Sequence, residues 1–152
     1  MKKLLLVGLL LLANAVSADH YTPETFEDAT KLPQNKLLVL LTEISNCPYC
    51  SQIKEQFLGP LSLAAEFGPY ITIASINLES SEKLIGFDGK AVTQDKWAQQ
   101  MMGVDFSPTV LILDPKTGQR LTDDLVGLAT PDFYGFYLEQ NINKAKQSLA
   151  ID

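Results

Sequence analysis

The only cysteines of this 152-residue chain, Cys47 and Cys50, have two residues between them in the stretch EISNCPYCSQIK. Such a pair can be a structural disulfide, half of a metal site or a dithiol that reacts by disulfide exchange. A disulfide across so short a loop would stabilise the fold only weakly, because it removes little entropy from the unfolded chain. A structural zinc site needs four ligands, and the chain offers one histidine, His20, far from the pair. The pattern therefore favours a reacting dithiol and no metal.

A buried strand and an amphipathic helix are predicted to position this pair. Residues 37–41 form a continuous apolar run, which is typical of a strand covered on both faces. Beyond the pair, Ile53, Phe57 and Leu61 recur at helical spacing, and Pro48 suits the first position of a helix. The pair should therefore lie where the strand passes into the helix.

The helix start should make the two cysteines unequal. Cys47 lies at the expected N-cap, where free backbone N–H groups and the positive end of the helix dipole favour a thiolate. The thiolate is the attacking species in disulfide exchange, so Cys47 is predicted to attack a partner. Cys50 lies one turn inside the helix and is predicted to resolve the mixed disulfide that forms.

The rest of the chain alternates further apolar strands with helices. Strands are expected at residues 71–76, 110–113 and 120–126, the last two joined as a hairpin by a turn at 114–118. Helices are expected from Thr93, as the cap, to Met102 and from Thr130-Pro131-Asp132 to about Ile142. A break or kink at Gly59-Pro60 is expected to leave a second short helix that ends near Phe67. The aromatic and methionine side chains of these helices are expected to pack in the core, among them Trp97, Met101, Phe133, Phe136 and Tyr137.

The first eighteen residues have the composition of a secretory signal peptide. A positive start at Lys2 and Lys3 precedes an apolar run over residues 4–12, which passes into small residues up to Ala18. The apolar run is too short to cross a bilayer as an anchor, for which about 20 residues are needed. We expect cleavage after Ala18, with Ala15 as the second choice, and an exported domain at residues 19–152.

The mature chain is predicted to be acidic. The full sequence carries a net charge of −6, and loss of the two leader lysines leaves ten cationic against eighteen acidic side chains, or −8. Phosphate backbones and anionic lipids repel such a chain, so nucleic acids and membrane surfaces are poor candidate partners. The 134 remaining residues suffice for one domain, and no glycine-rich phosphate loop follows any expected strand.

Three motifs in order resemble thioredoxin-fold proteins: CPYC after an apolar strand, GVDFSPTVLILD at 103–114 and VGLATPDFYGFYLEQNI at 126–142. The resemblance covers roughly residues 37–142, and it implies a first helix at Tyr21–Leu32. The stretch NLESSEKLIGFDGKAVTQDKWAQQM is similar to an insert of periplasmic thioredoxin-like proteins of the SoxW type. The resemblance implies an α/β fold with a central mixed sheet of about four to five strands, flanked by helices.

The resemblance also implies which residues dock a partner. In the family, the proline of the second motif follows a cis peptide bond and faces the dithiol, which implies this role for Pro108. The backbone of Ser107 would then pair with a bound substrate segment. Pro48 and Tyr49, between the cysteines, are assigned to the same substrate-binding surface.

Three departures from the family pattern bear on these assignments. The buried acid of cytosolic thioredoxins falls on Leu41 here, so Glu43 is the nearest acid; it is either a proton relay for Cys50 or a charged residue at a strand end. Asn46 replaces the tryptophan before the first cysteine, so the docking surface should differ. The dipeptide Pro48-Tyr49 also occurs in glutaredoxins, but the sequence shows no convincing glutathione pocket.

Together these patterns predict a periplasmic, monomeric thiol–disulfide oxidoreductase whose redox group is the Cys47–Cys50 dithiol, with no dissociable cofactor. We expect it to reduce disulfides of exported partner proteins, because Tyr49 is neutral and the nearest cation, Lys54, lies about two helical turns beyond Cys47. A membrane reductase would supply the electrons. The alternatives are an oxidase that inserts disulfides and a non-enzymatic binding module gated by its redox state.

Overall fold

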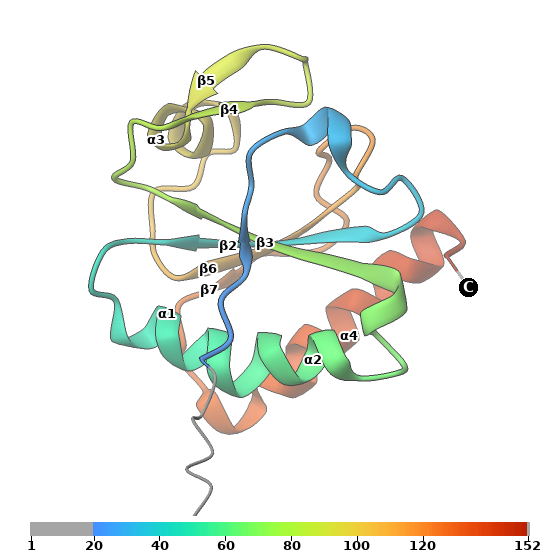
Figure 1. Ribbon diagram of the computed structural model, residues 1–152. Helices are drawn as coiled ribbons and strands as arrows, with labels where there is room; N and C mark the ends of the chain where they lie inside the picture. Colours follow the sequence, from blue (N-terminus) through green and yellow to red (C-terminus); the bar gives the residue numbers. More distant parts are fainter. Residues whose placement is uncertain (1–19, 152) are drawn as a thin grey trace, which may run out of the picture.

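The computed structural model describes residues 20–151, and its centre is a five-stranded sheet in the order β1-β3-β2-β6-β7 (Figure 1). The strands are Glu24–Thr25 (β1), Leu37–Glu43 (β2), Ile71–Asn77 (β3), Thr109–Leu113 (β6) and Leu125–Val126 (β7). β2 runs parallel to β3 and antiparallel to β6, so the sheet is mixed. The expected α/β fold is confirmed, whereas the expected signal peptide, residues 1–18, lies outside the described residues.

β2 forms the centre of the core, because all of residues 37–42 are buried. Successive side chains of a strand point to opposite faces. The side chains at positions 37, 39 and 41 therefore join the core under the long helices, and those at 38 and 40 join the core on the second face. A strand covered on both sides has to be apolar throughout, which explains the continuous run at 37–41.

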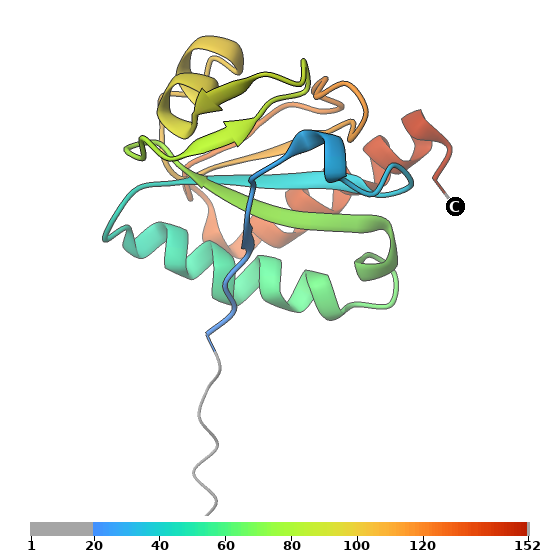
Figure 2. The ribbon, with the colours of Figure 1, turned by 45° about the horizontal axis from the view of Figure 1, so that its top comes forward.

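One helical rod carries the CPYC motif across the first face of the sheet (Figure 2). It consists of α1 (Pro48–Ile53), a π-helical turn (Lys54–Leu58) and α2 (Gly59–Leu63). The expectation of a break or kink at Gly59-Pro60 is right in part: the second short helix is present as α2, but a π turn joins it to α1 without a break in the helix. Pro60 has no N–H and would crowd the carbonyl four residues back in an ordinary helix, but the π turn lets the Gly59 N–H donate to the Lys54 carbonyl five residues back. The rod ends at Leu63, earlier than the expected Phe67.

The segment between β3 and β6 covers the second face of the sheet (Figure 1). It contains a two-stranded sheet of β4 (Lys83–Ile85) and β5 (Ala91–Thr93), then α3 (Gln94–Lys96) and a π-helical turn (Trp97–Met101). Trp97 is buried, and its ring lies 5.3 Å from the ring of Phe26. Thr93 takes the N-cap position as expected, but its side chain makes no capping hydrogen bond.

The segment Tyr21–Leu32 is not a helix, contrary to what the resemblance implied. Residues 24–25 form the edge strand β1, and the Phe26 N–H donates to the Ser75 carbonyl at 2.8 Å. This pairing holds the backbone extended and lets Phe26 bury its ring in the core of the second face. Only Ala29–Lys31 is helical, as one 3₁₀ turn.

The connection from β6 to β7 is confirmed in part. The turn at 114–118 closes through the Gly118 N–H, which donates to the Asp114 carbonyl at 2.8 Å. Of the expected strand at 120–126, only Leu125–Val126 pairs regularly with β6, and Arg120 makes an isolated bridge to Leu113. The Leu121 N–H still donates to the Ile112 carbonyl at 2.9 Å, and residues 122–124 leave the sheet.

The helix α4 (Pro131–Leu149) starts as expected and packs on the first face beside the α1–α2 rod. Its buried side chains recur every three or four residues and are Tyr134, Leu138, Ile142 and Ala145. The Tyr134 ring lies 4.8 Å from the Phe57 ring, and burial raises the pKa of Tyr134. This stripe defines the face that α4 turns toward the sheet.

The expectation that the helical aromatic and methionine side chains lie in the core is largely wrong. Trp97 is buried, but Met101 is 51% exposed and Phe133, Phe136 and Tyr137 are 60%, 60% and 44% exposed. Phe133 and Phe136 lie one and two positions from Tyr134, so the helix turns them away from the buried stripe. Tyr137, three positions from Tyr134, lies at the margin of that stripe and is the least exposed of the three. Hydrophobicity alone did not separate the buried stripe from this exposed one.

Two glycines should respond to alanine with opposite signs. A Cβ at Gly135, inside α4, would lie 3.5 Å from the Phe57 ring, an ordinary contact, so Gly135→Ala should raise the free energy of unfolding by about 0.5–1 kcal/mol. Gly118 has a φ of +72°, and a Cβ there would collide with the Phe87 ring. Gly118→Ala should therefore lower the free energy of unfolding by at least about 1–3 kcal/mol. Urea unfolding of the oxidised protein measures both, and equal signs would contradict the assignment.

Candidate functional site

Cys47 occupies the junction that the sequence indicated, between the end of β2 and the first turn of α1. It is the N-cap residue, with an extended backbone (φ −95°, ψ 102°), and Pro48 follows at the first turn of the helix. The Cys47 Sγ accepts a hydrogen bond from the Cys50 N–H at 3.1 Å. One free N–H group of the helix start is therefore aimed at this sulfur.

The two sulfurs form a disulfide, and they differ in access. The Cα atoms of Cys47 and Cys50 lie 5.2 Å apart. Cys50 is 1% exposed, whereas Cys47 is partly exposed and its neighbours Pro48 and Tyr49 are exposed. A partner approaching from solvent can therefore reach the Cys47 sulfur before the Cys50 sulfur.

The loop before β6 faces the disulfide. The Ser107 Oγ lies 3.3 Å from the Cys50 Sγ and 4.0 Å from the Cys47 Sγ. The peptide bond between Ser107 and Pro108 is cis, as the resemblance implied, and Pro108 is buried. Ser107, Pro108 and both cysteines, which are about 60 residues apart in sequence, thus meet at one place.

A buried threonine holds this loop, and the sequence analysis missed it. The Thr42 hydroxyl is shared between the carbonyls of Phe106 and Thr109, at 3.2 and 3.3 Å, and it accepts from the Thr109 N–H at 3.1 Å. The Ser107 hydroxyl in turn donates to the Thr42 carbonyl at 3.3 Å. The one signal in the sequence was a polar residue directly after five apolar residues of a buried strand.

Glu43, the candidate proton relay, is engaged in an ion pair. Its Oε2 lies 2.8 Å from the Nζ of Lys54, and both side chains are less than one-fifth exposed. Leu41, at the position of the family's buried acid, is fully buried in the core. A role for Glu43 in proton transfer at Cys50 stays a prediction, which the pH dependence of exchange in Glu43→Gln would measure.

The short segment between β2 and Cys47 is held by its own contacts. The Ser45 N–H donates to the Glu79 carboxylate at 3.1 Å. Asn46 has a φ of +55°, a left-handed conformation that asparagine adopts more readily than most residues. This turn, where cytosolic thioredoxins have tryptophan, reverses the chain so that Cys47 can begin the helix.

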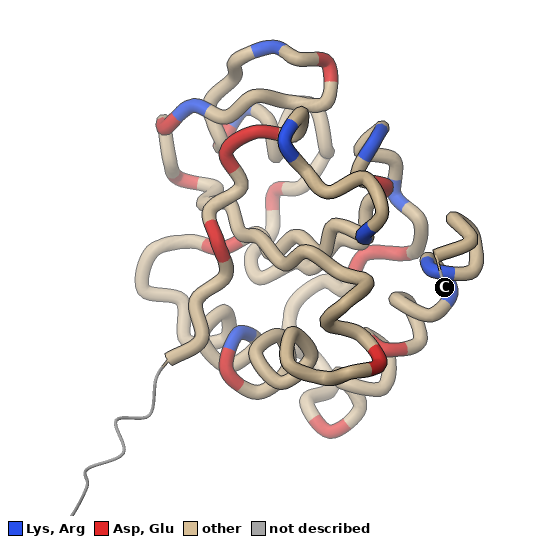
Figure 3. The backbone as a smooth tube through the Cα atoms, turned by 45° about the vertical axis from the view of Figure 1, so that its right-hand side comes forward, with Lys and Arg blue, Asp and Glu red and all other residues tan. Residues whose placement is uncertain are grey.

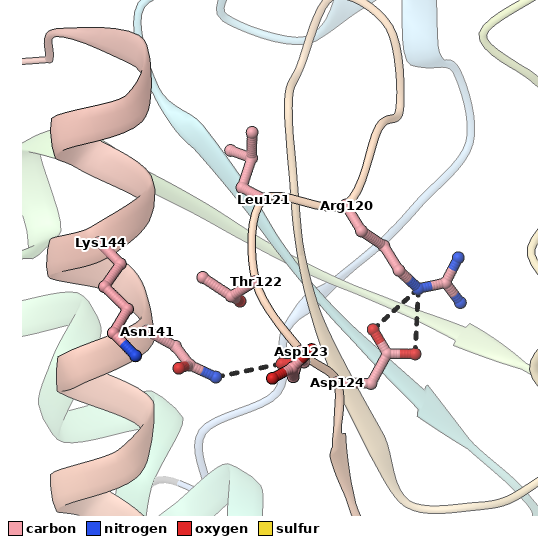
Figure 4. A pocket seen from close by; sticks show the side chains of 7 residues that line it. All are labelled: Arg120, Leu121, Thr122, Asp123, Asp124, Asn141 and Lys144. Atoms are coloured by element: carbon pink, nitrogen blue, oxygen red, sulfur yellow. Dashed lines mark hydrogen bonds and ion pairs between the residues drawn. The ribbon is translucent and has the colours of Figure 1, made fainter.

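A polar depression lies elsewhere, between α4 and the segment that joins β6 to β7 (Figure 4). Its lining residues are Arg120, Leu121, Thr122, Asp123, Asp124, Asn141 and Lys144. The Arg120 Nε pairs with Asp124 at 2.8 Å, and the Asn141 amide donates to the Asp123 carbonyl at 3.1 Å. The Thr122 hydroxyl is buried there without a hydrogen-bond partner among the described residues. The depression includes no thiol, so the disulfide remains the candidate site.

Two kinds of feature are absent from the described part of the chain. Residues 20–151 contain no group of three or more histidine, cysteine, aspartate or glutamate side chains that could hold a metal ion. Within the same residues, no helix has the length and apolar character needed to cross a bilayer.

Comparison with known proteins agrees with this geometry. Residues 24–141 match the family described as "Thioredoxin-like domain". No curated protein sequence matches the chain at a significant level. Among solved structures, the thioredoxin of Fasciola hepatica aligns with a TM-score of 0.53 and 16% identity over 81% of this chain and 99% of its own. The periplasmic thioredoxin SoxS of Paracoccus pantotrophus aligns with a TM-score of 0.49 and 18% identity over 72% of this chain and 99% of its own.

The chain belongs to the thioredoxin-like domain family, since the match covers more than half of its length. A CxxC pair closed as a disulfide at the start of α1 makes it a thiol–disulfide oxidoreductase. At 16% identity the thioredoxin structure supports the fold and no more. A closer kinship with the SoxW type stays a prediction.

Replacing Ser107 by alanine should make the disulfide harder to reduce. In the reduced protein the Ser107 hydroxyl can turn its one proton from the Thr42 carbonyl to a thiolate on Cys47 or Cys50, which stabilises the reduced form. Its loss should shift the reduction potential by about 10–30 mV to more negative values, up to a tenfold change in the equilibrium constant. Ser107→Thr keeps the hydroxyl and should stay close to wild type. Equilibration against glutathione buffers measures both variants, and an unchanged potential in Ser107→Ala would exclude this role.

Proposed function

We propose that this protein is exported and that its Cys47–Cys50 dithiol reduces disulfides of other exported proteins. The observation that carries the proposal is the unequal access of the two sulfurs at a helix N-terminus, with Cys47 partly exposed and Cys50 buried. A helix N-terminus lowers the pKa of a thiol and favours its thiolate. Only an accessible thiolate can begin disulfide exchange.

The exchange takes two steps. The Cys47 thiolate attacks one sulfur of the partner disulfide; a new S–S bond forms and the second partner sulfur leaves as a thiolate. Cys50 then loses its proton and attacks the Cys47 sulfur, which releases the first partner sulfur as a thiolate. Two electrons have passed to the partner, the partner sulfurs take up protons from solvent, and the protein is left with the Cys47–Cys50 disulfide.

The loop before β6 is proposed to dock the partner. Ser107, whose Oγ lies 3.3 Å from the Cys50 Sγ, is followed by the buried Pro108, and Pro48 and Tyr49 form the exposed rim on the helix side. Among residues 20–151, neither the N–H nor the carbonyl of Ser107 has a hydrogen-bond partner, so both are free for strand-like pairing with a substrate segment.

The reducing direction is supported by the charges around the pair. A strong oxidant over-stabilises its reduced form, usually through cations or donors near the attacking thiolate. Here Tyr49 is neutral, and the charge of Lys54 is balanced by Glu43 at 2.8 Å. The Cys47 thiolate therefore has the helix end and the Ser107 hydroxyl as its stabilising groups. A membrane reductase is proposed as the electron donor, because the exported compartment is kept oxidising.

Export is proposed from the composition of residues 1–18. The mature chain would begin at Asp19 and act as a monomer in the periplasm. N-terminal sequencing of the exported protein tests this proposal, and a membrane-bound protein that retains Lys2 would contradict it.

The exchange mechanism predicts different behaviour for the two cysteine variants. Cys50→Ser should accumulate stable mixed disulfides with partners, because Cys47 still attacks but nothing resolves the product. Cys47→Ser should trap almost none, since the buried Cys50 cannot reach a partner. Non-reducing electrophoresis measures the trapped species, and insulin reduction with dithiothreitol measures turnover by the wild type. Trapping by Cys47→Ser alone would reverse the assignment, and trapping without turnover would favour a redox-gated binding module.

The reduction potential should lie on the reducing side of about −200 mV. Known values run from about −270 mV for thioredoxin to about −120 mV for a strongly oxidising periplasmic enzyme. The paired Lys54 and the neutral Tyr49 favour the reducing end of this range. Equilibration against a dithiothreitol or glutathione buffer measures the potential, and a value near −120 mV would mean that the protein inserts disulfides.

A further inference from the structure

A small polar depression lies at the carboxyl ends of three parallel strands. β1 and β2 both run parallel to β3, and these strands end at Thr25, Glu43 and Asn77. Ligands of α/β proteins commonly bind at the carboxyl ends of parallel strands. The chain leaves β3 at this edge and passes to β4, β5 and α3 (Figure 1). The lining of the depression includes Thr25, Glu43, Ser75, Asn77, Glu82 and Gln94, and no cysteine.

Gln94 is a buried polar side chain with an unused donor. It is 3% exposed, and its Oε1 accepts from the Asn77 N–H at 2.8 Å. This bond satisfies the end of β3, but the two N–H groups on Nε2 have no hydrogen-bond partner among residues 20–151. Because Oε1 is turned to β3 and Gln94 lines the depression, Nε2 is the polar group that it offers there.

Ser75 adds a second buried polar group to the same wall. It is 6% exposed, and its hydroxyl has no hydrogen-bond partner within the part of the chain that the structure describes. Thr25 pairs with Ser75 in the register of β1 and β3, and paired residues carry their side chains on one face of the sheet. Buried polar groups nearly always form hydrogen bonds. Two buried side chains with free polar ends at one depression therefore indicate a polar occupant.

Glu82 supplies the uncompensated charge of this lining. The other carboxylate, Glu43, is paired with Lys54 at 2.8 Å. Glu82 has no basic partner within ion-pair distance among residues 20–151. The chain beside the depression is also acidic, since residues 21–30 carry three acidic residues and no lysine or arginine, as the first segment beyond the grey trace shows (Figure 3). The occupant should therefore carry a positive charge.

A second depression continues the first along β1. The volumes of the two are about 270 and about 450 Å³, and Thr25, Glu82 and Gln94 line both. The Gln94 N–H donates to the Glu82 carbonyl at 2.9 Å, which keeps these residues adjacent where the depressions meet. The other charged residues of the second depression add no net charge, because they are two acids and two lysines, Glu27, Asp28, Lys31 and Lys83. A ligand can thus place a charged head at the junction and extend along β1.

The occupant has to offer a cation and an acceptor oxygen close together. The Glu82 carboxylate accepts from a cationic donor, and the Gln94 Nε2 donates to an oxygen. A simple amine would leave the Gln94 donor unpaired, and a carboxylate alone would be repelled by Glu82. An α-ammonium group one carbon from a carbonyl, as at the amino end of a peptide, satisfies both residues.

We propose that this depression binds the free amino end of a peptide. The α-ammonium group pairs with Glu82, and the carbonyl oxygen of the same residue accepts from the Gln94 Nε2. The hydroxyls of Thr25 and Ser75 accept the remaining ammonium protons, and the next residues of the peptide extend into the second depression. Capture of an N-terminal amine is a known mode of peptide recognition. The site uses neither cysteine, so this binding is independent of disulfide exchange.

The test follows the Gln94 side-chain amide by nuclear magnetic resonance in the oxidised exported protein. The probe is trialanine amide, and we expect its addition to shift the Gln94 amide signals saturably. N-acetyl-trialanine amide lacks the charge and propylamine lacks the carbonyl, so each should bind at least about tenfold more weakly. Alanine amide keeps both groups but cannot reach the second depression, and it should bind about threefold more weakly.

Two variants separate the roles of the amide and the carboxylate. Gln94→Glu keeps an acceptor for the Asn77 N–H but loses the donor, and it should weaken binding of trialanine amide about tenfold, measured on the backbone signals of Ser75 and Asn77. Glu82→Gln changes an exposed side chain and should weaken it about fivefold. The matched control is Glu66→Gln, an exposed acid before the start of β3, which should bind as the wild type does. Thermal unfolding of each variant checks that it is folded.

Five outcomes overturn the inference. Equal affinity for the free and acetylated peptides would exclude recognition of the amine. Equal affinity for propylamine, or tighter binding in Gln94→Glu, would make the depression a site for simple cations. Equal affinity for alanine amide would make it a site for single amino acids. An equal loss in Glu66→Gln and Glu82→Gln would show a general charge effect. No saturable shift with any probe would show that the depression holds water only.

Discussion

The pairing of Thr42 with Thr109, at the end of β2, is the contact on which the rest of the site depends. It fixes the register between β2 and β6, and it therefore sets where the loop before β6 meets the helix after β2. The Thr42 hydroxyl bonds to both sides of that loop, at the Phe106 and Thr109 carbonyls and the Thr109 N–H. Because β2 is buried on both faces, this hydroxyl has no water to bond with, and leaving its partners unpaired would cost about 1–3 kcal/mol. The loop is thereby held against the disulfide.

The helical rod after β2 must meet two requirements, and Pro60 in its sequence opposes the second. Its first turn must present Cys47 and Pro48 at an N-terminus, and its length must cover the first face of the sheet. Pro60 would normally end such a helix. The π turn at Lys54–Leu58 resolves the conflict, since it shifts the backbone hydrogen bonding by one residue before the proline. Lys54 begins that turn and reaches back to Glu43 on β2, so the turn that preserves the helix also carries the ion pair near the site.

Local sequence patterns are enough to predict most strands and helices and the redox-active cysteine pair. The conformations that depend on contacts between distant parts of the chain could not be predicted from such patterns. The apolar run at residues 37–41 predicts the strand, and Pro48 in the CPYC motif predicts the start of the helix. Together they predict that Cys47 is more accessible than Cys50. The hydrogen-bond partners of Thr42 and Ser107 lie about 60 residues away along the chain, so no local pattern predicts them. The prediction of a helix at Tyr21–Leu32 was wrong for the same reason. The backbone of this segment is held extended by the hydrogen bond from the Phe26 N–H to the Ser75 carbonyl on β3. The aromatic residues of α4 show a different limit: their type is common to cores and docking surfaces.

Both backbone groups and side chains around the disulfide are available to bind a partner segment. The backbone of Ser107 can pair with any extended segment, which suits an oxidoreductase that meets many partners. Such pairing alone gives little selectivity, and the acidic net charge would repel acidic partners wherever they bound. On the helix side, Pro48 and Tyr49 add an exposed rim beside Cys47 without adding charge, where a cation would stabilise the thiolate and raise the potential. A neutral rim thus leaves the electrostatics of the dithiol to the start of α1 and to the Glu43–Lys54 ion pair.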